Sequence, residues 1–299
     1  MDINTLGKLI SSQRIDKKIS KVALCEGLCS ITALTRYENG IRIPDKFLAD
    51  ALLERLGLSS FVYEFVTSED EFYFVVQRKK IDKAIENLQI EDVLILIDEY
   101  VNRIDGKDKL HMQYILYTKG KICVLRQKIK DAEHLFEMAL NYTNCKNINE
   151  YGKGSILLTN IEIDIFYSWA ECLYSINRRD AIKIYSDLKT YFEYEKKQKK
   201  YYANILYLLA KEEMQKYNIG QALEYLNTAM NYMIDKYQIK DLYKVLKLKK
   251  EIECNLLLRG NSTVNDEFVF ALEMINSSVD GMISNEGIKL WENIVKHQL

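Results

Sequence analysis

Residues 28–44 read LCSITALTRYENGIRIP, and this stretch decides the fold of the first part of the chain. It predicts a short helix from Ser30 to Glu38, because a serine hydroxyl can cap the start of a helix. Asn39-Gly40 then ends the helix, since glycine readily takes the left-handed conformation of a helix stop. Both ends of this helix are therefore marked in the sequence.

Further helices are predicted on both sides of this stretch. Ser20 can cap a short helix that ends near Leu28, and Pro44 opens a helix that continues to Leu56. A helix, a tight turn and a second helix form the geometry of a helix-turn-helix. Residues 1–60 hold nine lysines and arginines against seven acidic residues. One such module would bind DNA weakly, so a dimer on two half-sites is expected.

The ordered residues from Leu6 to Gly40 resemble the amino-terminal domain of phage-repressor-type (XRE-type) regulators. Residues 28–44 are similar to the recognition helix and following turn of the peptide-pheromone-sensing regulators of the Rgg/PlcR/PrgX (RNPP) family. Lys21 stands where that family usually has glutamine, so phosphate anchoring is retained while a glutamine-mediated base contact is not. The resemblance also implies an internal ion pair. The implied ion pair joins Arg14 and Glu38. The residues that carry the resemblance are Leu6-Gly7, Arg14, Ser20-Lys21, Leu24, Leu28-Cys29-Ser30, Leu34 to Gly40, Arg42 and Pro44.

The helix predicted over 30–38 has an inward and an outward side. Leu34 and Tyr37 are expected to pack inward. Hydroxyl groups, Ile31 and Arg36 are expected to face outward, where they can contact base edges or phosphates. The candidate DNA-binding residues are Lys21, Ser30, Ile31, Thr32, Thr35, Arg36 and Arg42, and Lys46 is a further candidate phosphate anchor.

The composition of the 299 residues predicts an all-α protein. One proline and twelve glycines are too few for the many tight turns of a sandwich, a barrel or a doubly wound sheet. The net charge of −1 excludes a wholly basic nucleic-acid coat protein. No apolar run reaches the length of a membrane span and no signal peptide is recognisable, so a cytoplasmic protein with reduced cysteines is expected.

Helical repeats are predicted from about residue 80 onward. The tetratricopeptide pattern places a small residue on a first helix and then alanine, an aromatic residue and alanine on a second. Three stretches follow it, the first closely and the one that begins at Ala170 more loosely. These stretches are Leu116, Gly120 and Cys123 with Ala132, Phe136 and Ala139; Ala170 with Ala181, Tyr185 and Leu188; and Leu206, Leu209 and Ala210 with Ala222, Leu226 and Ala229. Pairs over Ala84 to Val101 and Lys240 to Ile275 would bring the number to about five.

These repeats resemble the tetratricopeptide receptor domain of the same regulator family. The expected fold is an N-terminal helix-turn-helix bundle followed by a right-handed superhelical array of about five TPR-like helix pairs. The expected domains are a DNA-binding domain over 1–60, a connector helix over 61–80 and a peptide-receptor and dimerisation domain over 81–299. The lysine-rich run at 196–200 is interpreted as a solvated loop and helix entry.

The first helices of the predicted pairs carry tyrosine and asparagine at positions that line the inner groove of such arrays. Aromatic rings can cover apolar side chains of a peptide, and asparagine can bond both N–H and C=O of its backbone. In the resembling receptors, asparagines on successive first helices hold the peptide main chain, and the resemblance places Asn160 and Asn204 there. Packing of the tyrosines, and capping or solvent-facing roles for the asparagines, are the alternatives. The candidate peptide-binding residues are Tyr117, Lys121, Asn160, Tyr167, Asn204, Tyr207 and Asn227.

No catalytic, metal or cofactor site is expected. The three histidines, at 111, 134 and 297, lie in no metal-binding or catalytic motif, and phosphate-binding glycine motifs are absent from the sequence. The function predicted is a transcriptional regulator that binds a pseudo-palindromic operator as a homodimer and responds to a short signalling peptide. The alternatives are an array that only dimerises or binds a partner protein, and a relative that inhibits response regulators or resembles phosphatases. The DNA-binding motif argues against the last of these.

Overall fold

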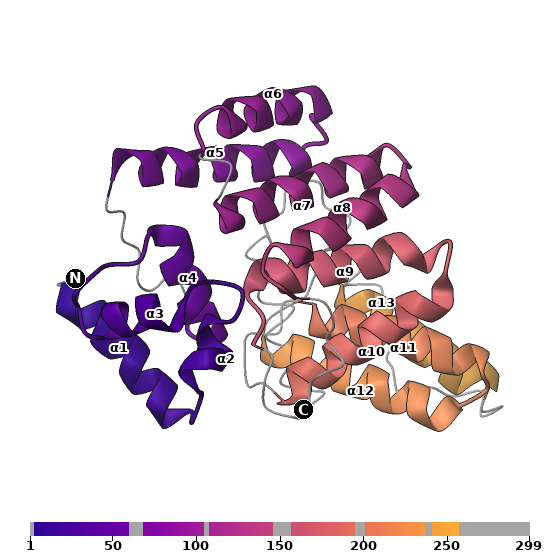
Figure 1. Ribbon diagram of the computed structural model, residues 1–299. Helices are drawn as coiled ribbons and strands as arrows, with labels where there is room; N and C mark the ends of the chain where they lie inside the picture. The colour runs from indigo at the N-terminus through magenta and orange to yellow at the C-terminus, as the bar shows by residue number, and fades with distance from the viewer. Residues whose placement is uncertain are drawn as a thin grey trace, which may run out of the picture. The chain divides into compact units, whose positions relative to one another are not determined.

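The computed structural model describes residues 3–59, 68–104, 108–145, 157–194, 201–236 and 241–256. Within these ranges the chain forms thirteen α-helices and one π-helical turn, with no strand, as the composition predicts (Figure 1). The chain divides into two compact units, Met1–Gln198 and Lys199–Leu299.

The first unit begins with a bundle of four helices, here called the head. Ser20 and Ser30 cap α2 and α3 as predicted: their hydroxyls accept hydrogen bonds from the backbone N–H of Ala23 and Ala33. Gly40 ends α3 with a φ of +68°, in the left-handed region that the sequence predicted. The head helices are α1 (Ile3–Asp16), α2 (Lys21–Cys25), α3 (Ile31–Glu38) and α4 (Lys46–Arg55).

Three helix pairs follow in the same unit and are here called the proximal array (Figure 1). The predicted small and aromatic positions are buried where the helices of a pair meet: Ala132, Phe136, Ala139, Ala170, Ala181, Tyr185 and Leu188 are all at most 1% exposed. This burial confirms the two predicted repeats of this region. The pairs are α5 (Glu69–Glu86) with α6 (Ile90–Val101), α7 (Lys109–Leu125) with α8 (Ile129–Asn141), and α9 (Asn160–Tyr174) with α10 (Arg178–Tyr194).

The second unit contains the third predicted repeat. Helices α11 (Tyr202–Gln215) and α12 (Ile219–Asp235) pack together. Their predicted contact positions Leu206, Leu209, Ala210, Ala222, Leu226 and Ala229 are buried. Helix α13 (Leu242–Glu251) and a π-helical turn (Ile252–Leu256) follow. The lysine-rich run at 196–200 lies outside the described residues, as do residues 240 and 257–275 of the pair predicted over Lys240 to Ile275.

Helix α5 differs from its expected extent. It begins at Glu69 and continues to Glu86 without interruption, so the connector expected over 61–80 and the first helix of the following pair are one helix where the structure describes them. Residues 60–67 lie outside the described residues. Of the helices that the structure describes, none combines the length and apolar character needed to cross a bilayer.

Candidate DNA-binding and peptide-binding surfaces

Helix α3 presents a polar face to solvent. Ser30, Thr32 and Arg36 are exposed, and Ile31 is 48% exposed. Leu34 and Tyr37, on the opposite side, are buried in the head as predicted. The Arg36 guanidinium makes no hydrogen bond or ion pair with the described part of the chain, so its donors are available to a ligand.

Two of the candidate DNA contacts hold each other in place. The Thr35 hydroxyl donates to Ile31 O at 2.9 Å and accepts from Lys21 Nζ at 3.0 Å. Lys21 also forms an ion pair with Glu38 at 3.2 Å, although a third of its side chain remains exposed. A phosphate at this position would therefore share the ammonium with groups of the head.

The ion pair between Arg14 and Glu38, implied by the family resemblance, is confirmed. Arg14 Nε lies 2.6 Å and Nη2 3.1 Å from the two carboxylate oxygens of Glu38, which is a bidentate arrangement. Burial by itself would raise the pKa of Glu38, but the hydrogen bonds and charges of Arg14 and Lys21 outweigh it and hold the pKa below its usual value. This carboxylate ties α1 and α2 to the end of α3.

The two remaining cationic candidates differ. Arg42 is exposed just after α3, and its backbone N–H donates to Arg36 O. Lys46 is only 7% exposed, and its Nζ pairs with Asp50 at 2.6 Å. The prediction of a phosphate anchor at Lys46 is therefore wrong, because the first turn of α4 faces inward and supplies its own counter-charge one turn later.

In the proximal array the two candidate tyrosines are buried. Tyr117 is 9% exposed and Tyr167 is 5% exposed. The ring of Tyr117 lies 6.2 Å from Phe136, and Lys121 Nζ lies 5.4 Å from its centroid. Burial raises the pKa of Tyr117, and the charge of Asp164 adds to this effect. Packing accounts for much of both side chains, and little of either remains exposed to a ligand.

Charged groups lie around Lys121 on the first helices of the proximal array. Asp82 on α5 and Glu171 on α9 are exposed, yet burial raises the pKa of both, and the charge of Lys121 partly offsets it in each case. Both carboxyls lie close enough to Lys121 for its charge to act on them. The sequence interpretation missed Asp82, because α5 was not expected to supply a first helix at that position.

Asn160 lies at a helix start and not within a helix. It is the exposed first residue of α9, and its backbone N–H donates to Glu54 Oε2 on α4 at 2.9 Å. The preceding Thr159 and the following Glu162 form a capping box. The T-x-x-E spacing of these two residues is a signal in the sequence that would have located this start.

The remaining candidates lie in the second unit. Asn204 and Tyr207 are partly exposed on α11, and Lys211 Nζ lies 5.8 Å from the Tyr207 ring centroid. Asn227 is exposed on α12. The role of all three in peptide binding stays a prediction.

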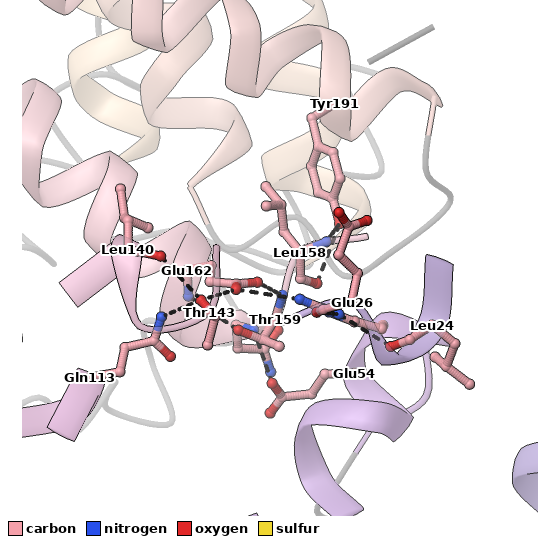
Figure 2. Close-up of polar contacts among 12 residues, drawn as sticks. Leu24, Glu26, Glu54, Gln113, Leu140, Thr143, Leu158, Thr159, Glu162 and Tyr191 are labelled. Atoms are coloured by element: carbon pink, nitrogen blue, oxygen red, sulfur yellow. Dashed lines mark hydrogen bonds and ion pairs between the residues drawn. The ribbon is translucent and has the colours of Figure 1, made fainter. Parts of the chain in front are cut away.

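A buried polar network was not anticipated from the sequence. It joins Arg55 at the end of α4 to Glu162 on α9 and to Thr143 after α8 (Figure 2). No spacing rule connects residues that lie about a hundred positions apart in the chain.

The next feature is the set of potential metal ligands and cysteine thiols among the described residues. They contain no group of three histidine, cysteine or acidic side chains placed to hold a metal ion. All six cysteines are free thiols. Burial raises the pKa of Cys29 and of Cys172 to about 11, which keeps both protonated at neutral pH.

Comparisons with known proteins give a likeness in structure. No protein-family model and no curated protein sequence matches the chain. A solved structure of Bacillus thuringiensis PlcR in complex with the peptide PapR7 and DNA is similar, with a TM-score of 0.51 and 12% sequence identity. The match covers 98% of this chain and 99% of that chain. The chain therefore has the fold of PlcR, with a helix-turn-helix head followed by tetratricopeptide-like helix pairs.

Proposed function

We propose that the chain is a DNA-binding transcriptional regulator that is controlled by a short signalling peptide, as in quorum sensing. The observation that carries the proposal is the polar, exposed face of α3 on a chain that shares its fold, over almost its whole length, with a protein solved together with peptide and DNA. Neither the head nor the helix pairs alone would support both ligands.

The DNA side of the proposal rests on α3. Its exposed Thr32 and Arg36 offer a hydroxyl and a free guanidinium to base edges, and Ile31 offers an apolar contact to a thymine methyl group. Arg42 and the exposed part of Lys21 supply phosphate contacts. A single α3 reads few bases, so two copies on a pseudo-palindromic operator are proposed.

The peptide side rests on the first helices of the pairs. Lys121, Asn204 and Tyr207 are accessible and offer a cation, an amide and a phenol. An extended peptide needs such groups along its main chain, and each of the two units carries some of them on a first helix. The exposed carboxyls of Asp82 on α5 and Glu171 on α9 add polar groups to two further first helices.

One observation favours the alternative in which the array only dimerises or binds a partner protein. Tyr117 and Tyr167 are almost completely buried and serve as packing. A thermal shift experiment separates the two functions, with synthetic peptides from small open reading frames beside the gene as probes. A rise in melting temperature with one of these peptides supports peptide control, whereas no rise with any of them favours the alternative.

Asn204→Ala tests the peptide site itself. Loss of an amide that bonds the peptide main chain is expected to weaken peptide binding by roughly tenfold and leave DNA binding unchanged. Asn141→Ala, an exposed asparagine at the end of α8 outside the candidate set, is the matched control. If Asn204→Ala changes neither peptide binding nor stability, or if it unfolds the chain, the assignment of Asn204 is wrong.

A further inference from the structure

A buried ion pair joins the head to the proximal array (Figure 2). Arg55 Nη2 lies 3.5 Å from Glu162 Oε1, and the two side chains are 5% and 0% exposed. Within the head, Arg55 Nη1 donates to Leu24 O at 3.1 Å and to Glu26 O at 2.6 Å. Arg55 therefore belongs to the head, and one of its donors is directed at α9.

The proximal array holds Glu162 independently of the head. Thr143 Oγ1 donates to Glu162 Oε1 at 2.6 Å, and the Thr159 N–H donates to Oε2 at 2.7 Å. Gln113 Nε2 in turn donates to Thr143 Oγ1 at 2.9 Å. The carboxylate is thus held by groups of the proximal array, and it presents a negative charge at one defined point.

Close backbone packing accompanies the ion pair. Gly27, in the turn between α2 and α3, has a φ of +69°, and a Cβ built on it would lie 1.9 Å from Thr143 O. Glu54 accepts a hydrogen bond from the Asn160 N–H. Leu157, just before α9, is buried among the core residues of the head. The head is therefore closely packed against the proximal array at this contact.

A second anchor lies at the start of α4. The guanidinium carbon of Arg78 on α5 lies 3.9 Å from the ring centroid of Phe47 and 4.3 Å from that of Tyr114. The ring of His111 lies 4.7 Å from Phe47. Arg78 thus contacts the head through Phe47 and contacts α7 through Tyr114, one turn before Tyr117.

The energetics point to positioning more than to stability. A buried ion pair gains little over an apolar contact, but it heavily penalises any arrangement that leaves one charge buried without its partner. The 3.5 Å separation and the buried Arg55 Nε, which has no hydrogen-bond partner, agree with a modest net gain. The exposed face of α3 takes no part in the contact, so the head is fixed while its DNA-facing residues stay accessible.

We propose that the Arg55–Glu162 contact is a positional lock that sets the orientation of the head on the proximal array. In a dimer, two locked heads would read two half-sites at one fixed spacing. The lock rests on the proposed function, because it assumes paired heads on DNA.

Glu162→Gln tests the lock. Glutamine keeps the shape and can still accept the Thr159 hydrogen bond, but it leaves the Arg55 charge without a counter-charge and favours release of the head into water. Glu137→Gln makes the same charge change at an exposed position on α8 and is the matched control. Bound sequences are selected from a duplex library of random sequence with the full chain.

The selection distinguishes the possible failures. The wild type and Glu137→Gln are expected to enrich paired half-sites at one spacing, and Glu162→Gln to enrich the same half-site at several spacings. If Glu162→Gln retains the single spacing, the lock is wrong while the proposed function stands. If the wild type enriches no sequence, the proposed function is wrong and the lock falls with it.

Hydrogen exchange gives a readout that needs no DNA. The Asn160 amide is bonded to Glu54 of the head, so release of the head is expected to speed its exchange at least tenfold in Glu162→Gln and not in Glu137→Gln. Phe47→Leu, which removes the ring from the second anchor, is expected to act in the same direction. Unchanged exchange of the Asn160 amide in both Glu162→Gln and Phe47→Leu would overturn the lock.

Discussion

Gly120 on α7 faces the ring of Phe136 on α8 so closely that a Cβ built on the glycine would lie 2.5 Å from Phe136 Cε1. The ring is completely buried, so it has no room to move away. Backbone and ring meet without an intervening side chain, and this contact fixes the distance between the two helices of the pair.

Gly120→Ala is expected to destabilise the protein. The overpacking penalty, about 1–3 kcal/mol, exceeds the gain of up to about 1 kcal/mol in helix propensity. Gly220→Ala on α12 is the control, since nothing lies within 4 Å of its Cβ position and its stability should stay equal or rise slightly. Urea unfolding measures both, and a Gly120→Ala protein as stable as the wild type would contradict the packing.

Glu38→Gln should weaken the head, because it leaves Arg14 and Lys21 without the carboxylate that they share. A loss of roughly 2–4 kcal/mol is expected at pH 7. The pKa of Glu38 is lower in the folded chain than its ordinary 4.5, so its contribution is present above that pH and is lost as the pH falls through the folded value.

The stabilities of the wild type and Glu38→Gln should therefore converge in acid. Asp16→Asn, at the exposed end of α1, removes a carboxylate without breaking a described contact. Its stability should match that of the wild type at pH 7 and at pH 3. A constant difference between the wild type and Glu38→Gln from pH 7 to pH 3 would be inconsistent with the ion pair.

His111 predicts a second pH dependence. Burial lowers its pKa from 6.5 to about 4, and the Arg78 charge acts in the same direction against a smaller effect of Asp108. The unfolded chain therefore binds a proton between these values that the folded chain does not, so stability falls as the pH drops from 6.5 toward 4, by about 1–3 kcal/mol.

Replacement of His111 should remove this loss. His111→Gln is expected to show a flatter stability profile between pH 7 and pH 5, and His134→Gln, at an exposed position on α8, should follow the wild type. Thermal unfolding at the two pH values measures the difference. A His111→Gln profile as steep as that of the wild type would assign the pH dependence to other groups.

Arg36→Ala is expected to cost about 1–3 kcal/mol of DNA binding and to relax the sequence preference at one position of the half-site. Its exposed guanidinium makes no hydrogen bond or ion pair within the described chain, so its loss should leave the unfolding curve unchanged. Arg179→Ala, an exposed arginine on α10, is the control for the loss of one positive charge. Reduced stability with an unchanged sequence preference would mean that Arg36 is structural.

The helical pattern was predictable because its signals are local. Ser30 and Gly40 mark the ends of α3 within the sequence, and the small and aromatic positions of the pairs recur at regular spacing on neighbouring helices. Side chains that pack inside the head or between the two helices of a pair recur at helical spacing along the sequence. The confirmed burial of Phe136 and Leu226 follows from it.

The polar contacts between elements were not predictable, because they depend on tertiary packing. Lys46 has the positive charge that a phosphate anchor needs, but α4 packs so that the Lys46 ammonium pairs with Asp50. Arg55 and Glu162 lie on separate helices with no shared pattern in the chain. Only the local capping box of Glu162 with Thr159 left a signal in the sequence.

The central claim, a DNA-binding chain under peptide control, is tested most directly by fluorescence anisotropy of a labelled duplex that carries the half-sites selected from the random library. The account predicts saturable binding by the full chain. It also predicts that a peptide encoded beside the gene changes the dissociation constant at least fivefold in the wild type and not in Asn204→Ala. Binding no tighter than to an unrelated duplex, or a peptide effect of equal size in Asn204→Ala, would contradict it.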